Sequence, residues 1–240
     1  MINILNKNKT YITRFGFTLA EVLITLGIIG IVAAMTMPVL TEKVNHIISV
    51  NRLKKMYSTL SQAMLFTLAK DGDYSSLGIV DQDTSSIENW YKNSLKPQLK
   101  ITKECIDSSG CWAKTTKALN GGTPKWHRPG IGLGYNVMIA STIDGYTIDI
   151  DGYAKNDTTF GVNMKNDYVA VYVDINGLKN PNVIGKDIFV FVFGEKGFIP
   201  AGRDKSDAEV NADCSSSGTG YFCFEKIMRN GWEIPKENRW

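Results

Sequence analysis

Histidine and cysteine are scarce in this 240-residue chain, which has two histidines, His46 and His127, and four cysteines. Because the two histidines lie far apart in the sequence, a histidine-rich metal site or a histidine-based catalytic triad is a poor hypothesis. The G-x-S-x-G, H-E-x-x-H and Walker motifs are also absent. We therefore expect a protein that is not an enzyme and that needs no cofactor.

Excess charge of either sign is also small. The chain has 27 Lys+Arg against 24 Asp+Glu, a net charge of +3, and no dense basic block that would indicate nucleic-acid binding. The composition thus gives no sign of a nucleic-acid partner, and the sequence does not decide whether there is one. Lys7, Lys9 and Arg14 account for the whole excess, because residues 1–16 contain no acid. With 43% hydrophobic and 21% charged residues, the chain has the composition of a globular protein.

A long uncharged run follows this basic start. Val22 to Leu40 are 19 residues without a charge, which span roughly 28 Å as a helix and match a bilayer core. The preceding positive charges predict a cytoplasmic N-terminus and an exported remainder. A secretory signal would have a shorter apolar run, and a plain single-span anchor leaves Glu21 unexplained. A carboxylate near the start of such a helix is costly unless it has a partner.

The residues around this glutamate form a known pattern. Gly16-Phe17-Thr18-Leu19-Ala20-Glu21 resembles the cleavage and methylation motif of type IV pilins and of the pseudopilins of type II secretion. The resemblance implies that a prepilin peptidase cuts between Gly16 and Phe17 and methylates the new amino group of Phe17, leaving 224 residues (240 − 16). Glu21 lies four residues from Phe17 on one helix face, where it can neutralise that amino group or a neighbouring subunit's. Pro38 stands where many of these proteins have a helix-kinking proline.

The resemblance also implies a function. We expect a structural subunit, major or minor, of a type IV pilus or a type II secretion pseudopilus. Its partners would be copies of itself, related pilins, the prepilin peptidase and the inner-membrane assembly platform. The chain would cross the inner membrane once, with its N-terminus in the cytoplasm and its head in the periplasm or outside the cell, before joining the filament. The alternative is a membrane-anchored periplasmic binding protein or enzyme that does not polymerise.

The sequence predicts an α+β fold in which a long N-terminal helix packs on an antiparallel sheet. Beyond Pro38 apolar residues recur at helical spacing, and the helix should end near Asp71. The predicted segments are a leader at 1–16, a membrane and polymerisation helix at 17–40, an amphipathic helix at 41–71 and a globular head at 72–240. Residues 73–130 read as irregular, apart from a short helix that begins near Ser86. Strands are predicted at 134–141, 145–150, 168–175, 187–193 and 197–199, with turns that include Asp144-Gly145 and Asp151-Gly152, and a late helix at 221–230.

All four cysteines follow the apolar run, in a compartment where disulfides persist. Proximity favours the local pairs Cys105–Cys111 and Cys214–Cys223, although other pairings stay open. Each such loop closure would contribute on the order of 2–3 kcal/mol. A zinc site is a weak alternative because neither spacing is C-x₂₋₄-C.

One head segment is rich in oxygen-bearing side chains. Asp174, Asn176 and Asp187 flank a Gly/Pro loop between two predicted strands and form a candidate calcium site. Calcium prefers six to eight oxygens, but this segment offers two carboxylates and also carries Lys179 and Lys186. A loop held by side-chain-to-backbone hydrogen bonds is therefore the favoured interpretation. Asp149-Ile-Asp151-Gly152 is a weaker calcium candidate and reads as a hairpin turn.

Overall fold

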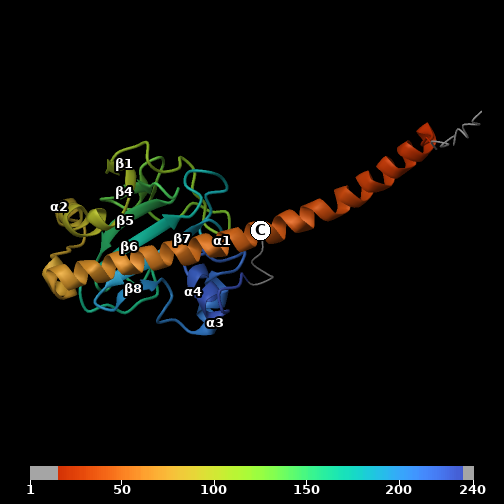
Figure 1. The fold of residues 1–240 in the computed structure, drawn as a ribbon. Coiled ribbons are helices and arrows are strands. Elements are labelled where there is room, and N and C mark those ends of the chain that lie inside the picture. Colours follow the sequence, from red (N-terminus) through yellow and green to blue (C-terminus); the bar gives the residue numbers. More distant parts are fainter. Residues whose placement is uncertain (1–15, 235–240) are drawn as a thin grey trace, which may run out of the picture. The chain divides into compact units, whose positions relative to one another are not determined.

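The computed structural model describes residues 16–234, and the chain divides into two compact units, Met1–Val44 and Asn45–Trp240. One helix, α1 (Leu19–Asp71), provides residues to both units (Figure 1). Its end at Asp71 agrees with the sequence pattern, and the next residue, Gly72, has the positive φ of 94° that suits a helix C-terminus. Most of the predicted leader, including Lys7, Lys9 and Arg14, lies outside the described residues.

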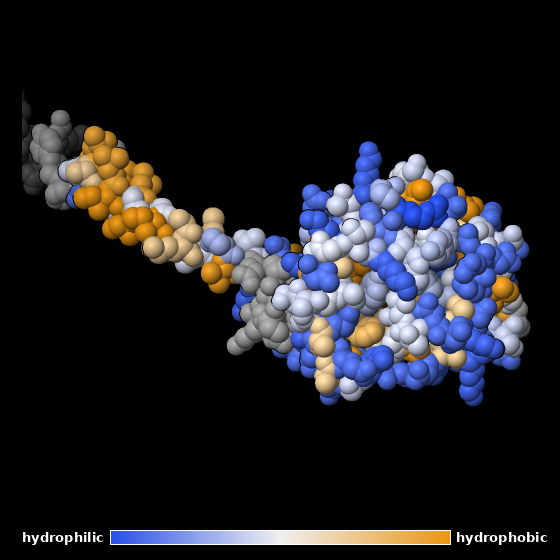
Figure 2. Space-filling model, turned by 180° about the vertical axis from the view of Figure 1, so that it is seen from behind, coloured by the Kyte–Doolittle hydropathy of each residue, from blue (hydrophilic) through white to orange (hydrophobic). Residues whose placement is uncertain are grey.

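The first unit consists of the apolar part of α1. Its large side chains are exposed, for example Leu23, Ile29 and Met35 at 61%, 62% and 74% of their surface. The helix contains a window of mean hydropathy 2.3 with no buried residue, which is long and apolar enough to cross a membrane. Figure 2 shows this segment covered by hydrophobic side chains, whereas the visible face of the head is mostly hydrophilic.

The second unit is built on an antiparallel sheet of six strands, in the order β1-β4-β5-β6-β7-β8. From β4 onward each strand pairs antiparallel with the next strand along the chain. Short turns join β4 to β5 and β7 to β8, whereas longer loops join β5 to β6 and β6 to β7. The strands are β1 (Ile101–Ile106), β4 (Met138–Thr142), β5 (Thr147–Tyr153), β6 (Tyr168–Asp174), β7 (Ile188–Gly194) and β8 (Gly197–Pro200). A separate two-stranded sheet joins β2 (His127–Arg128) to β3 (Gly132–Leu133). The predicted α+β layout, a long helix followed by an antiparallel sheet, is confirmed.

Both faces of the sheet are covered. On one face, Leu53, Met56, Leu60 and Met64 of α1 share a buried core with phenylalanines of β7. The helices α2 (Thr84–Trp90) and α4 (Cys223–Arg229) contribute to the same core, and α3 (Asp207–Asp213) lies beside α4 (Figure 1). Short helical turns at Tyr74–Leu77, Tyr91–Leu95 and Lys96–Gln98 complete the helical elements.

Loops cover the other face. Tyr168 and Tyr172 of β6 pack there against Trp112, Phe160 and Tyr221, which come from three different loops. Since both faces are covered, every residue of β6 and β7 is buried. This explains why these two strands are continuous apolar runs instead of alternating patterns.

Three local predictions are wrong. Residues 73–130, expected to be irregular, contain β1, which pairs with β4. Asp151-Gly152 is not a turn, because both residues lie inside β5 and pair with Ala170 and Val169. The helix α2 begins earlier than Ser86, since the Asp83 side chain accepts a hydrogen bond from Ser85 N as the N-cap.

Candidate functional site at the start of the apolar helix

The first turn of α1 is closed by a reciprocal pair of side chains. Thr18 N and Thr18 Oγ1 both donate to Glu21 Oε2 at 2.8 Å, and Glu21 N donates to Thr18 Oγ1 at 3.2 Å. This is a capping box, in which a Thr and a Glu three residues later satisfy the free amides of a helix start. The arrangement holds the Glu21 carboxylate beside the residue that follows Phe17. The T-x-x-E spacing in the sequence is the signal that could have predicted it.

The peptide bond before this turn is open to solvent. Phe17 is 90% exposed, and Gly16 is exposed with no atom within 4 Å of the position that a Cβ would occupy. A protease can therefore reach the bond between the two residues without unfolding any packed part of the described chain. The structure thus brings Gly16, Phe17 and Glu21 together within one turn.

The threonines of the apolar segment satisfy their hydroxyls within the helix. Thr25 Oγ1 donates to Glu21 O, Thr36 Oγ1 to Val32 O and Thr41 Oγ1 to Met37 O, each at 2.9 Å. Such back-bonding removes the cost of placing a hydroxyl in an apolar medium. The exposed aliphatic side chains around them require lipid or other helices as neighbours. The segment is therefore suited to a membrane and to helix packing.

Comparison with known proteins agrees with this geometry. The model of the prokaryotic N-terminal methylation motif matches residues 13–37. The chain thus carries the signal of type IV pilins and pseudopilins, a class of structural proteins. No curated protein and no solved structure matches the chain.

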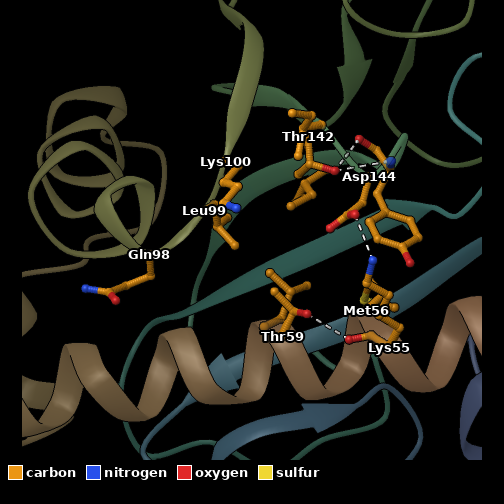
Figure 3. A pocket seen from close by; sticks show the side chains of 12 residues that line it. Lys55, Met56, Thr59, Gln98, Leu99, Lys100, Thr142 and Asp144 are labelled. Carbon is orange, nitrogen blue, oxygen red and sulfur yellow. Dashed lines mark hydrogen bonds and ion pairs between the residues drawn. The ribbon is translucent and has the colours of Figure 1, made fainter.

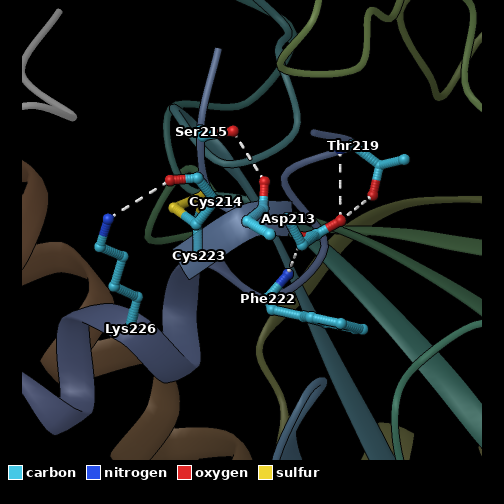
Figure 4. Close-up of a disulfide and its surroundings, with 8 residues drawn as sticks. Asp213, Cys214, Ser215, Thr219, Phe222, Cys223 and Lys226 are labelled. Atoms are coloured by element: carbon cyan, nitrogen blue, oxygen red, sulfur yellow. Dashed lines mark hydrogen bonds between the residues drawn. A yellow bond between two sulfur atoms is a disulfide. The ribbon is translucent and has the colours of Figure 1, made fainter. Parts of the chain in front are cut away.

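In the head, the four cysteines form two disulfides, Cys105–Cys111 and Cys214–Cys223. The second joins the end of α3 to the start of α4 across a nine-residue separation (Figure 4). Next to it, Asp213 accepts hydrogen bonds from Phe222 N at 2.7 Å and Thr219 N at 3.3 Å. The loop between the cysteines is therefore fixed both covalently and by hydrogen bonds.

The residues of the candidate calcium site lie together at the loop between β6 and β7. Asp187 accepts hydrogen bonds from Val183 N at 2.6 Å, Asn182 N at 2.8 Å and Asn176 Nδ2 at 3.2 Å. Burial, and then the neighbouring Asp187, raise the pKa of Asp174 to about 8, and burial also raises the pKa of Asp187. Among the described residues, no group of three or more His, Cys, Asp or Glu could hold a metal. The contacts are those of a loop held by side-chain-to-backbone hydrogen bonds.

Two further buried carboxylates hold the end of β3 and the residues that follow it before β4. Asp149 Oδ2 accepts from Leu133 N at 2.6 Å, and Asp151 accepts from Tyr135 N at 3.1 Å and Asn136 N at 3.4 Å. Burial raises the pKa of Asp151 to about 6 and the pKa of Asp149 well above its usual range. The sequence around these aspartates was interpreted as a hairpin turn. Instead, both are residues of β5, and their side chains bind the backbone of the segment that begins at Leu133.

A cavity of about 350 Å³ lies between α1 and the edge of the sheet (Figure 3). Met56, Leu60 and Ile148 contribute to its apolar lining, and Lys55 pairs with Asp144 across it at 2.7 Å. Asp144 is the one acidic residue among its lining residues, and this group contains no His, Cys or Ser. The lining therefore combines apolar side chains with one ion pair.

Proposed function

We propose that this protein is a filament subunit, a pilin of a type IV pilus or a pseudopilin of a type II secretion system. A prepilin peptidase cleaves it after Gly16 and methylates Phe17, and α1 then carries it into a helical filament. The observation that carries the proposal is the methylation motif at residues 13–37, placed at the exposed start of a helix long enough to span a membrane. The rest of α1 and the sheet form a head with its own core.

The position of Glu21 supports a role in assembly. Cleavage creates a positive amino group at Phe17, and the capping box already holds the Glu21 carboxylate at this end of the helix. In lipid, an unpaired carboxylate is costly, so a nearby ammonium group of the same or a neighbouring subunit is its natural partner. Repetition of this contact between subunits gives a heterologous, open assembly, which is the symmetry of a fibre.

The topology follows from the same segment. The basic residues Lys7, Lys9 and Arg14 precede the span, so the N-terminus stays in the cytoplasm before cleavage and the head is exported. Export places the four cysteines where their two disulfides are stable. The partners before and during assembly are then the peptidase, the inner-membrane platform and further copies or related pilins.

Mass spectrometry of the membrane-extracted protein tests the proposal. The wild type should lack residues 1–16 and carry one methyl group on Phe17, whereas Gly16→Phe should retain its full mass. Gly16 has no neighbour within 4 Å of its Cβ position, so the larger side chain leaves the described fold undisturbed. Gly27→Ala, also without such neighbours, is the matched control and should be processed normally.

Two results would refute the proposal. One is an uncleaved wild-type chain in cells that contain an active prepilin peptidase. The other is a processed chain that stays monomeric in the membrane and is absent from sheared filaments. The second result would favour the competing function, a single-span anchor that displays a binding or catalytic head.

A further inference from the structure

Two segments, made mostly of loops on the face of the sheet opposite α1, carry basic residues and no acid. Residues 108–143 contain three lysines and Arg128 but no Asp or Glu, and residues 175–186 contain Lys179 and Lys186 but no acid. The loops are joined by two backbone hydrogen bonds, Lys117 N to Asn182 O at 3.0 Å and Ile184 N to Lys117 O at 2.9 Å. The surface formed by these two segments is therefore basic, although the whole chain has nearly equal numbers of positive and negative residues.

A cavity of about 740 Å³ opens between these loops. The first loop lines it with Gly110, Lys114 and Thr115, among others, and the second with Leu178 and Asn180. At the same place, the ammonium group of Lys103 donates to the carbonyl oxygen of Gly110 at 2.7 Å. The cavity is of the size that small-molecule sites have in proteins.

The positive charges around this cavity are not neutralised by ion pairs. Lys103, Lys114 and Lys179 are exposed, and none of them forms an ion pair with a residue that the structure describes. The acids nearby are engaged elsewhere. Asp107 pairs with Arg128, and Asp213 accepts hydrogen bonds from the backbone of its own loop. An anionic ligand would therefore meet the ammonium group of Lys114 in the lining. Lys103, which contacts Gly110, and Lys179, which lies between Leu178 and Asn180 in the sequence, are further cations beside the lining residues.

The other lining groups indicate which kind of anion fits. Ser109 and Thr115 offer hydroxyls and Asn180 an amide, whereas Ala113 and Pro129 offer apolar surface. A sugar ring has the matching chemistry, with hydroxyls around its edge and C–H groups on its faces. We propose that this cavity binds an acidic polysaccharide, with a sugar ring inside the cavity and its carboxylates on Lys103, Lys114 and Lys179.

The same observations favour a polysaccharide over other polyanions. A DNA duplex is too wide to enter a cavity of this size, and single-stranded nucleic acid depends on exposed rings for base stacking. Trp112, the aromatic residue in the lining, is 3% exposed. An extended acidic peptide would add to a strand edge, but the lining residues all lie outside strands.

Calorimetric titration of the full-length chain in phosphatidylcholine nanodiscs tests the proposal, with tetragalacturonate as the probe. We expect binding that weakens as salt is raised, because exposed charges are screened. Maltotetraose, which is neutral, should bind more weakly. A combined Lys114→Glu and Lys179→Glu variant should lose roughly tenfold or more in affinity, the factor expected when a charge-assisted hydrogen bond is lost.

Two further variants separate the cavity from a general effect of charge. Lys100→Glu makes a like change of charge at an exposed lysine that lines the other cavity, beside α1, and it should bind normally. Thr115→Trp fills the proposed site without changing any charge, and it should abolish binding. Unaltered binding by Thr115→Trp would overturn the proposal. Equal affinity for tetraglutamate or for an oligonucleotide of the same charge would also overturn it, since either would show a basic surface without selectivity for sugars.

Discussion

Thr18 and Glu21 exchange hydrogen bonds across the first turn of α1, one residue beyond the predicted cleavage site. The glutamate therefore has two separable roles, capping the helix and carrying a negative charge. Glutamine at position 21 can keep the capping contact but loses the charge, whereas leucine loses both. If charge pairing with the amino group of Phe17 drives assembly, both variants should be cleaved normally and both should be depleted from sheared filaments.

Quantitative blotting of filament and membrane fractions measures this prediction. Thr25→Val is a suitable control, because it removes a hydroxyl that bonds only to backbone carbonyls of the helix in the described chain. Normal incorporation of Glu21→Gln would show that capping, and not charge, is the contribution of this residue.

The second prediction concerns the disulfides. Cys214–Cys223 joins two cysteines nine positions apart in the sequence, between two short helices, and both cysteines are buried. Replacing both by alanine should destabilise the head by about 2–3 kcal/mol through the entropy of the unfolded chain. For a protein of this size that is a fall of roughly 5–10 °C in the melting temperature of the head, which circular dichroism can follow in detergent. A double-alanine variant that melts at the same temperature as the wild type would contradict the prediction.

The third prediction is a pH dependence. Burial, reinforced by Asp187, raises the pKa of Asp174 to about 8, far above that of an aspartate in the unfolded chain. The folded head therefore holds a proton that the unfolded chain releases between about pH 4 and pH 8, so its stability falls as pH rises through that window. Asp174→Asn mimics the protonated acid and should melt higher than the wild type at pH 8, with a flatter pH profile.

The matched control is Asp144→Asn, whose carboxylate is 43% exposed and pairs with Lys55. It should leave the slope between pH 4 and pH 8 unchanged. A wild-type head that becomes more stable from pH 5 to pH 8 would contradict the sign of the prediction.

The fourth prediction concerns calcium at the same loop. Both oxygens of Asp187 already accept hydrogen bonds, from Val183 N and Asn182 N. Millimolar calcium would have to displace these contacts, so we expect it to leave the melting temperature of the head unchanged at pH 7. A rise that is reversed by a chelator and lost in Asp174→Asn would instead establish a calcium site there.

The sequence predicted those elements whose signal is local. The helix end at Asp71 and the strands β6 and β7 follow from periodicity and from apolar runs bounded by turns. The edge strand β1 was missed because Thr102, Lys103 and Glu104 are exposed and give no alternation, so its identity depends on pairing with β4, more than 30 residues away. The helix α3 was not predicted either. Val210 is its one buried residue, so it has no apolar stripe that the sequence could show.

The functional residues also divide into those with a local sequence signal and those that depend on long-range packing. Gly16, Phe17 and Glu21 are a contiguous motif and could be found from the sequence. The capping boxes at Thr18 and Ser206 are also local signals, and both could have been used. The role of Asp151 could not, because its partners Tyr135 and Asn136 become neighbours only through the packing of β5.

The last prediction tests this packing at Gly134. A Cβ at that position would lie 2.1 Å from Asp151 Oδ2, so Gly134→Ala must push the carboxylate away from the amides that it binds. Overpacking of this kind costs about 1–3 kcal/mol, and the buried carboxylate also loses hydrogen bonds. Chemical denaturation should show the loss as a lower midpoint with an unchanged slope. In an Asp151→Ala background the same substitution should cost clearly less, because the clash is then gone, and equal costs in the two backgrounds would show that Gly134 and Asp151 are not coupled.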